Sequence, residues 1–157
     1  MTIRDDDGGL ETLPLRLMIV AAVVALSIVP AADSLESFRS REFVQRAERQ
    51  LDMIVSAAEI IAMQGPGNVR TLSVDLRGGG AAGFSMLFLG DKNDGPNMSS
   101  AIIELRNGMR LIKSAASPAV WMRSPTFDAL IVSSEMFDIR MSAVLDGGTL
   151  SVVAEEV

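Results

Sequence analysis

The sequence LMIVAAVVALSIVPAA occupies residues 17–32 and contains no charged side chain. As a helix rising about 1.5 Å per residue, this run reaches roughly 24 Å, slightly less than the ~30 Å hydrocarbon core of a bilayer. Adding Leu13 to Arg16 gives a spanning length if the Arg16 guanidinium extends to the interface. We therefore expect residues 13–32 to form a transmembrane helix or the core helix of a filament.

Two other interpretations of this run stay open. A secretory signal peptide fits its length, but the flank Arg4-Asp5-Asp6-Asp7 is acidic where such a peptide is basic. A buried helix of a soluble protein needs protein around every face, and this chain is too small to supply it.

The apolar pattern continues beyond Ala32 in a helical period. Pro30 is expected to kink the helix, and Asp33 or Ser34 to begin it again. Charges of both signs occupy the other faces, which favours packing on a protein domain over a membrane surface. Gln64-Gly65-Pro66-Gly67 is a helix stop signal. The apolar positions are spaced by three or four residues: Val44, Ala47, Leu51, Ile54, Ala58 and Ile61, with Leu35 and Phe38 beginning the stripe in a shifted phase.

From Val69 the period changes to two, which indicates β-strands. Asn107-Gly108 predicts a type I′ hairpin in which Ile103 lies opposite Ile112. Short turns without intervening helices imply one antiparallel sheet, and the amphipathic helix is the long element able to cover it. The expected strands are 69–76, 84–89, 101–106, 109–113, 120–122, 129–132, 136–144 and 150–154.

The sequence thus predicts an α+β fold: a long N-terminal hydrophobic and amphipathic helix packed on a C-terminal antiparallel β-sheet. We divide the chain into a leader (1–9), a helix (10–64) and a β-domain (65–157). Residues 13–32 form the transmembrane or filament-core half of the helix, and residues 33–64 form its amphipathic half.

Three loop motifs invite a functional interpretation. The glycine-rich run 78–83 lacks the Gly-Lys-Ser/Thr ending of a phosphate loop, so we interpret it as a flexible hairpin loop. The segment 91–96 resembles an acidic calcium loop but lacks the ligand spacing of an EF-hand, which favours a solvated turn. Asn97-Met98-Ser99 is an N-glycosylation acceptor tripeptide, which makes Asn97 a candidate for modification if the domain is extracellular.

The composition argues against most enzymatic chemistry. The chain contains no His and no Cys, the residues most used as general base, thiolate nucleophile or zinc ligand. Its net charge of −6 disfavours nucleic-acid binding. The carboxylates are spread over different predicted strands, and Trp121 fits a core or rim position of the sheet, with a ligand contact as the alternative. We expect a protein that is not an enzyme, with no catalytic residues, metal site or cofactor.

Two segments resemble a known family. Asp7-Gly8-Gly9-Leu10-Glu11-Thr12-Leu13-Pro14-Leu15-Arg16-Leu17 is similar to the start of some archaeal type IV pilin-like membrane proteins, and Gly65-Pro66-Gly67-Asn68-Val69-Arg70-Thr71 resembles a linker recurrent in that group. The resemblance implies cleavage by a prepilin peptidase-like protease after Gly9, or otherwise Gly8. It also implies that Glu11 neutralises a neighbouring subunit's terminal amine, and that Arg16 pairs with Glu11 or an adjacent subunit.

The resemblance implies a structural subunit, major or minor, of a pilus-like surface filament. Its partners would be membrane lipid before assembly, and afterwards copies of itself or other pilin-like subunits. Its β-domain would be extracellular and its helix a single membrane pass. The alternative is a membrane-anchored cell-surface binding module that does not polymerise.

Overall fold

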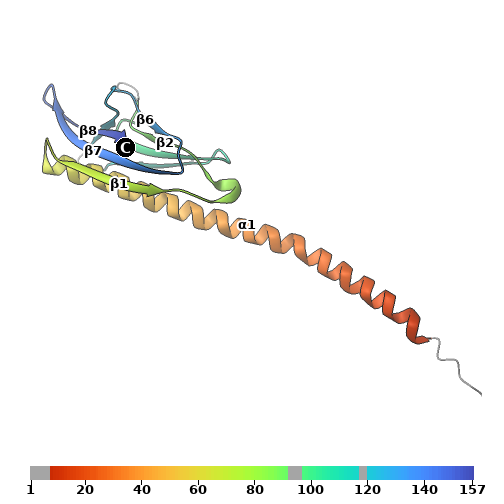
Figure 1. Cartoon of the computed structure of the whole chain (residues 1–157). Coiled ribbons are helices and arrows are strands. Elements are labelled where there is room, and N and C mark those ends of the chain that lie inside the picture. The colour runs from red at the N-terminus through yellow and green to blue at the C-terminus, as the bar shows by residue number, and fades with distance from the viewer. Residues whose placement is uncertain (1–7, 92–96, 117–119) are drawn as a thin grey trace, which may run out of the picture. The chain divides into compact units, whose positions relative to one another are not determined.

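The computed structural model describes residues 8–91, 97–116 and 120–157, without the side chains of residues 8–14, 27 and 29–31. These residues form an α+β fold in which helix α1 (Gly8–Gln64) precedes the strands, with a short 3-10 helix η1 (Gly80–Ala82) among them (Figure 1). Two compact units divide the chain at Phe38 and Arg39. The first unit contains the beginning of α1, and the second contains the rest of α1 and the strands.

The strands occur close to the predicted positions, in the order expected. Most bounds differ from the prediction by one or two residues, and β2 agrees at both ends. The strands are β1 (Val69–Asp75), β2 (Phe84–Leu89), β3 (Ser100–Leu105), β4 (Arg110–Ser114), β5 (Trp121–Arg123), β6 (Leu130–Val132), β7 (Met136–Asp146) and β8 (Thr149–Glu156).

The strands form two sheets, so the prediction of one antiparallel sheet is wrong. One sheet has the order β1-β7-β8-β5 and the other β4-β3-β2-β6. All pairs are antiparallel except β5–β8, in which Trp121 lies opposite Ser151 in a parallel ladder. A strand's partner depends on residues distant in sequence, and local periodicity carries no information about them.

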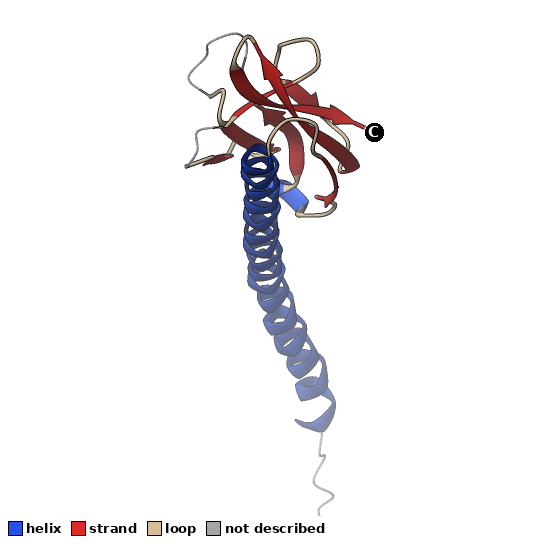
Figure 2. Cartoon of the chain, turned by 90° about the vertical axis from the view of Figure 1, so that its left-hand side faces the viewer, coloured by secondary structure: helices blue, strands red, loops and turns tan. Residues whose placement is uncertain are grey.

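One hydrophobic core joins the second part of α1 to both sheets. Ala47, Ile54 and Ala58 of α1 are fully buried, together with Leu87 of β2 and Ile139 of β7. The predicted stripe from Ala47 to Ile61 is therefore confirmed. Figure 2 shows the strands gathered beside this end of the helix. Leu35 and Phe38, predicted to begin the stripe, are instead exposed.

The predicted start of the amphipathic segment is wrong, and its predicted end is right. The backbone of α1 remains helical through Pro30, so the new start expected at Asp33 or Ser34 does not form. A helix can continue through proline by giving up one backbone hydrogen bond. The stop is confirmed: α1 ends at Gln64, and Gly65 has a φ of +88°.

Asn68 completes this helix terminus. Its Nδ2 donates to the carbonyl oxygens of Gln64 and Gly65, each at 3.0 Å, and so satisfies acceptors that the helix leaves unpaired. The linker then joins β7, because Gly67 N–H donates to Ala143 O and Ala143 N–H donates to Asn68 O.

The hairpin between β3 and β4 exists, but its predicted turn type and register are wrong. Leu105 N–H donates to Met109 O and Gly108 N–H to Leu105 O, which makes a three-residue loop. Gly108 has a φ of +82°, whereas Asn107 lacks the positive φ that a type I′ turn requires. The loop is one residue longer than predicted, so Ile103 lies opposite Leu111, and Ile112 opposite Ile102.

The glycine-rich run is a crossover between the two sheets rather than the predicted hairpin loop. It connects β1 of one sheet to β2 of the other. Gly78, Gly79 and Gly80 all have positive φ, and a Cβ on Gly79 would meet the Phe43 ring at 2.5 Å. Glycine is needed here because the backbone lies directly against an aromatic ring of the core.

Candidate assembly surface

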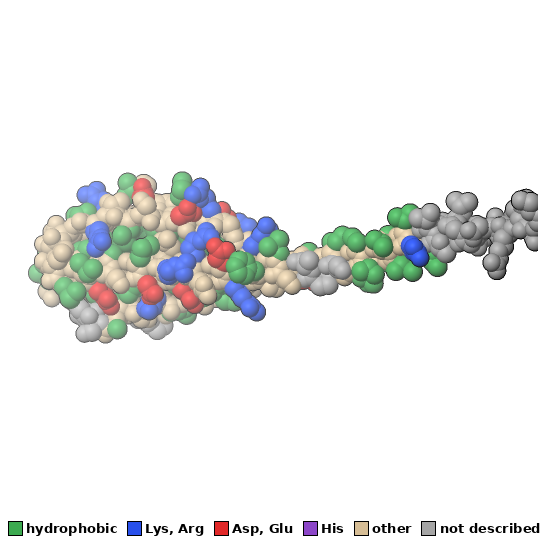
Figure 3. Space-filling model, turned by 90° about the horizontal axis from the view of Figure 1, so that it is seen from below, with side chains coloured by type: hydrophobic (Ala, Val, Ile, Leu, Met, Phe, Trp, Pro, Cys, Tyr) green, Lys and Arg blue, Asp and Glu red, His purple; other side chains and the backbone are tan. Residues whose placement is uncertain are grey.

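The first unit presents apolar side chains to its surroundings. From residue 15 to residue 28, every described side chain except Arg16 is apolar. Successive helical residues are rotated by about 100°, so this run covers all faces of α1. In Figure 3, hydrophobic side chains cover this part of the helix in the view shown. The large ones are 52–76% exposed: Leu15, Leu17, Met18, Ile19, Val20, Val23, Val24, Leu26 and Ile28.

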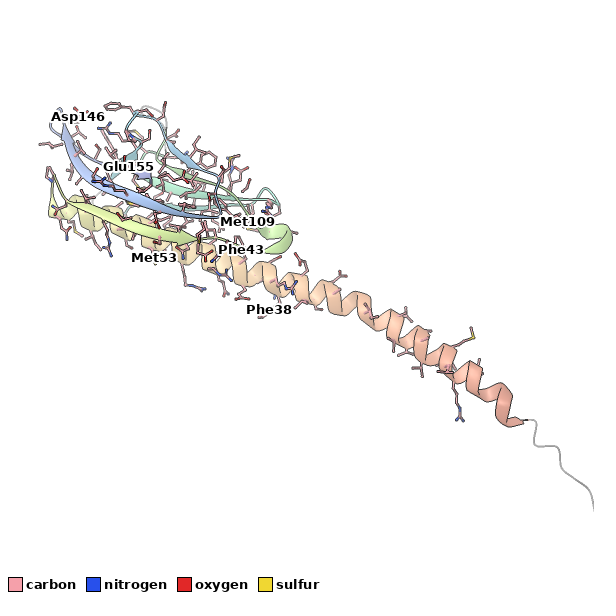
Figure 4. The ribbon with its side chains drawn as sticks, viewed as in Figure 1. Phe38, Phe43, Met53, Met109, Asp146 and Glu155 are labelled. Atoms are coloured by element: carbon pink, nitrogen blue, oxygen red, sulfur yellow. The ribbon has the colours of Figure 1, made fainter. Side chains whose placement is uncertain are left out.

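A second apolar feature lies on the outer face of α1 in the second unit. Met53, Ile60 and Met63 are exposed, although the buried stripe of the same helix segment packs on the sheets. Their spacing of seven and then three residues places them on one face. Figure 4 shows Met53 on the side of the helix away from the strands. We call these three residues the outer stripe. This stripe was not predicted, although its spacing is visible in the sequence.

The residues singled out by the pilin-like resemblance lie at the beginning of α1. The helix starts at Gly8, so Gly8, Gly9 and Glu11 all belong to its first turn. The leader segment 1–7 is outside the described residues. Arg16 is exposed on the same helix. Cleavage at the glycines, and the assembly roles of Glu11 and Arg16, stay predictions.

Asn97 directly follows residues 92–96, which lie outside the described residues. Most of the segment 91–96, interpreted from the sequence as a solvated turn, therefore lies outside them as well. The backbone N–H and the Nδ2 of Asn97 donate to Asp91 Oδ2 at 3.3 and 3.4 Å. Its carbonyl accepts from Ser100 N–H at 2.9 Å. The side chain is partly exposed. Modification of this side chain therefore stays a prediction.

Several charged side chains of the second unit form ion pairs at its surface. Lys113 Nζ lies 2.7 Å from Asp52 Oδ1, which raises the pKa of the lysine through the hydrogen bond and the opposite charge. Arg77 donates to both carboxylate oxygens of Asp75 and lowers the pKa of that carboxyl to about 2. These pairings hold Lys113 and Asp75 in their charged forms near neutral pH, so neither side chain is suited to acid–base catalysis.

Within the described ranges, the structure contains no cluster of three or more Asp or Glu side chains that could hold a metal ion. Among the same residues, no helix has a stretch both long enough and apolar enough to cross a membrane.

No protein-family profile, curated protein or solved structure matches this chain.

Proposed function

We propose that this chain is a pilin-like structural subunit of a cell-surface filament, which assembles through the apolar first part of α1. The observation that carries the proposal is the exposure of every large apolar side chain described between Leu15 and Ile28. Exposing apolar area to water costs a free energy of about 25 cal/mol per Å². Lipid before assembly, and other copies of the same helix afterwards, would each remove it from water.

Two further features support assembly over a solitary anchor. The outer stripe extends exposed apolar surface along the face of α1 that does not pack on the strands. The Gly8-Gly9 pair and Glu11 stand at the start of the helix, where a processed subunit would present its new terminus. In this proposal the glycine pair is the cleavage site, and Glu11 offsets the terminal amine of a neighbouring subunit.

The second candidate is a membrane-anchored module that does not polymerise. It uses the same apolar helix but leaves the outer stripe without a partner. The two candidates differ in where the full-length product is found, because only a filament subunit enters fibres that can be sheared from cells.

The test combines shearing, microscopy and mass spectrometry. Sheared surface material should contain fibres, and their subunit should lack residues 1–9 or 1–8. A subunit that retains Met1 and stays in the membrane fraction would contradict the proposal and favour the anchored module.

A matched pair of charge substitutions tests the role of the apolar segment. Val20→Glu places a carboxylate among the exposed apolar side chains, at a cost of roughly 2.5–3.5 kcal/mol in a hydrocarbon environment. We expect it to reduce the fibre fraction by about ten-fold or more, since each 1.4 kcal/mol is a factor of ten. Ser37→Glu, at an exposed position of the same helix, should leave the fibre fraction unchanged. Equal effects of the two substitutions would argue against assembly through this segment.

A further inference from the structure

A small pocket lies beside the parallel strand pair of the second unit. Its volume is about 230 Å³, below the roughly 300–1,000 Å³ of pockets that take drug-sized ligands. Space of this size suits a single ring. The lining includes two aromatic rings, one guanidinium, two hydroxyls and two carboxylates: Trp121, Phe127, Arg123, Thr149, Ser151, Asp146 and Asp91.

Arg123 is held in one orientation at this pocket. Its guanidinium stacks on Phe127 with Cζ 3.9 Å from the ring centroid. Its Nε donates to Ser151 Oγ at 3.2 Å and its Nη2 to Asp146 Oδ2 at 3.4 Å. The side chain is only 14% exposed, and guanidinium groups present several fixed donors at once. The pocket therefore offers directed hydrogen-bond donors rather than a mobile charge.

Phe127 occupies a strained backbone conformation that turns its ring to the pocket. Among the residues that the structure describes, Phe127 is the one non-glycine residue with a positive φ, at +66°. Such a conformation is unusual for a bulky residue and persists only when the surroundings enforce it. Two hydrogen bonds do so here: Phe127 N–H donates to Ser124 O, and Ser124 N–H donates to Asp128 O.

Trp121 supplies a second aromatic surface. It is 41% exposed although it belongs to β5, and the neighbouring Met122 is buried. Of the core and rim positions predicted for Trp121, this exposure fits the rim. An indole at the edge of a pocket combines a large apolar face with one hydrogen-bond donor.

The charges at the pocket disfavour an ionic ligand. An anion would meet Asp146 and the pocket-lining Asp91, and the positive charge of Arg123 is already paired with Asp146. A cation would meet Arg123, which already occupies the Phe127 face. A neutral ring with hydroxyl groups avoids both conflicts, because hydroxyls donate to carboxylates and accept from guanidinium.

We propose that this pocket binds one ring of a neutral saccharide, stacked on Trp121 and hydrogen-bonded by Arg123 and Asp146. The apolar C–H face of a pyranose would lie on the indole. The hydroxyls at its edge would face the guanidinium, the carboxylate and the hydroxyl of Thr149. The proposal does not depend on whether the chain polymerises.

The saccharide has two possible sources. One is a glycan of another molecule at the cell surface. The other is a glycan carried by this chain on Asn97, whose Nδ2 lies 3.4 Å from the carboxylate of the pocket-lining Asp91.

The test uses the full chain, made in a host without N-glycosylation and kept in a detergent whose headgroup is not a sugar. Trp121 is the one tryptophan of the chain, so its fluorescence reports on the pocket directly. The probes are methyl glycosides of glucose, galactose, mannose and N-acetylglucosamine, with sulfate and tetramethylammonium as charged comparisons. We expect a saturable fluorescence shift with at least one glycoside in the millimolar range. No saturation by any glycoside at about 50 mM, or saturation by either ion instead, would overturn the proposal.

Variants then identify the contacts, with binding followed by ligand-observed NMR. Trp121→Ala should weaken glycoside binding at least ten-fold, and Trp121→Phe, which keeps an aromatic face, should weaken it less. Ile131→Ala removes another exposed apolar side chain, one that does not line the pocket, and it should leave binding unchanged. Equal losses in Trp121→Ala and Ile131→Ala would overturn the assignment to this pocket. Protein made in a glycosylating host separates the two sources. If the ligand is external, added glycoside should bind the wild type. If the chain's own glycan fills the pocket, added glycoside should bind Asn97→Gln but not the wild type.

Discussion

The ring of Phe43 lies against Gly79 so closely that a Cβ on the glycine would be 2.5 Å from Phe43 Cγ. The contact joins α1 to the crossover between the two sheets. It also explains how a glycine-rich segment can be an ordered part of the core, since the backbone itself is the packing surface.

This contact predicts a difference between two adjacent glycines. Gly78 and Gly79 have φ of +93° and +90°, but a Cβ on Gly78 would meet nothing within 4 Å. Gly78→Ala should therefore cost only backbone strain, about 1–2 kcal/mol of unfolding free energy. Gly79→Ala adds overpacking against Phe43 and should cost about 2–5 kcal/mol. Urea denaturation followed by Trp121 fluorescence measures both.

A double-mutant cycle isolates the ring. In a Phe43→Ala background Cγ and the rest of the ring are gone, so Gly79→Ala should cost no more than Gly78→Ala. Equal costs of the two glycine substitutions in the wild-type background would show that Phe43 does not restrict the crossover.

The end of α1 gives a second prediction. Asn68 Nδ2 donates to two carbonyls of the helix terminus. Asn68→Asp replaces that donor with a carboxylate at the negative end of the helix dipole, so it should destabilise the fold by about 1–2 kcal/mol. Asn68→Ala only removes the donor and should cost less. Thermal unfolding compares the two variants, and a more stable Asn68→Asp would contradict the capping role.

The third prediction concerns pH. The pKa of Asp75 is lowered from 3.8 to about 2, first by the side-chain hydrogen bond from Arg77 and then by that residue's backbone N–H. Because the folded pKa lies below the ordinary value, the stabilisation is complete above about pH 4 and is lost as the pH falls towards 2. NMR titration of the Asp75 carboxyl carbon should show the low pKa. In Arg77→Gln it should return towards 3.8, and an unchanged value would exclude the Arg77 side chain as the cause.

The register of the β3–β4 hairpin gives a fourth prediction. Ile103 is fully buried, whereas Ile112 is 57% exposed. Ile103→Ala should cost about 2–5 kcal/mol because it leaves a cavity, and Ile112→Ala should cost well under 1 kcal/mol. The type I′ register would place both side chains on one face. Similar losses for both variants would therefore support that register over the observed one.

Sequence periodicity predicted the helix and the strands because the buried face of each is set by the spacing of its own apolar residues. The alternation of Phe137, Ile139 and Met141 marked one buried face of β7, and all three are buried. The buried stripe of α1 and its stop at Gly65 were predictable for the same reason. The α+β class followed from these elements.

The arrangement of the strands was not predictable in this way. The parallel pairing of β5 with β8 joins residues about thirty positions apart, and the one-residue difference in the hairpin depends on which turn the surroundings select. The stack of Arg123 on Phe127 required that β5 and its following loop be placed in space first. The outer stripe, in contrast, could have been predicted, since its spacing is present in the sequence.

The position of β8 has a consequence for how the protein is made. This strand follows all the other described strands in the chain, yet it lies between β7 and β5 in its sheet. While the ribosome is still adding residues 149–156, β5 has no ladder to join and β7 lacks one of its two neighbours. That sheet can close only after this segment has emerged, when α1 has long been outside the exit tunnel. The apolar start of α1 is therefore exposed to its surroundings before the domain behind it can fold.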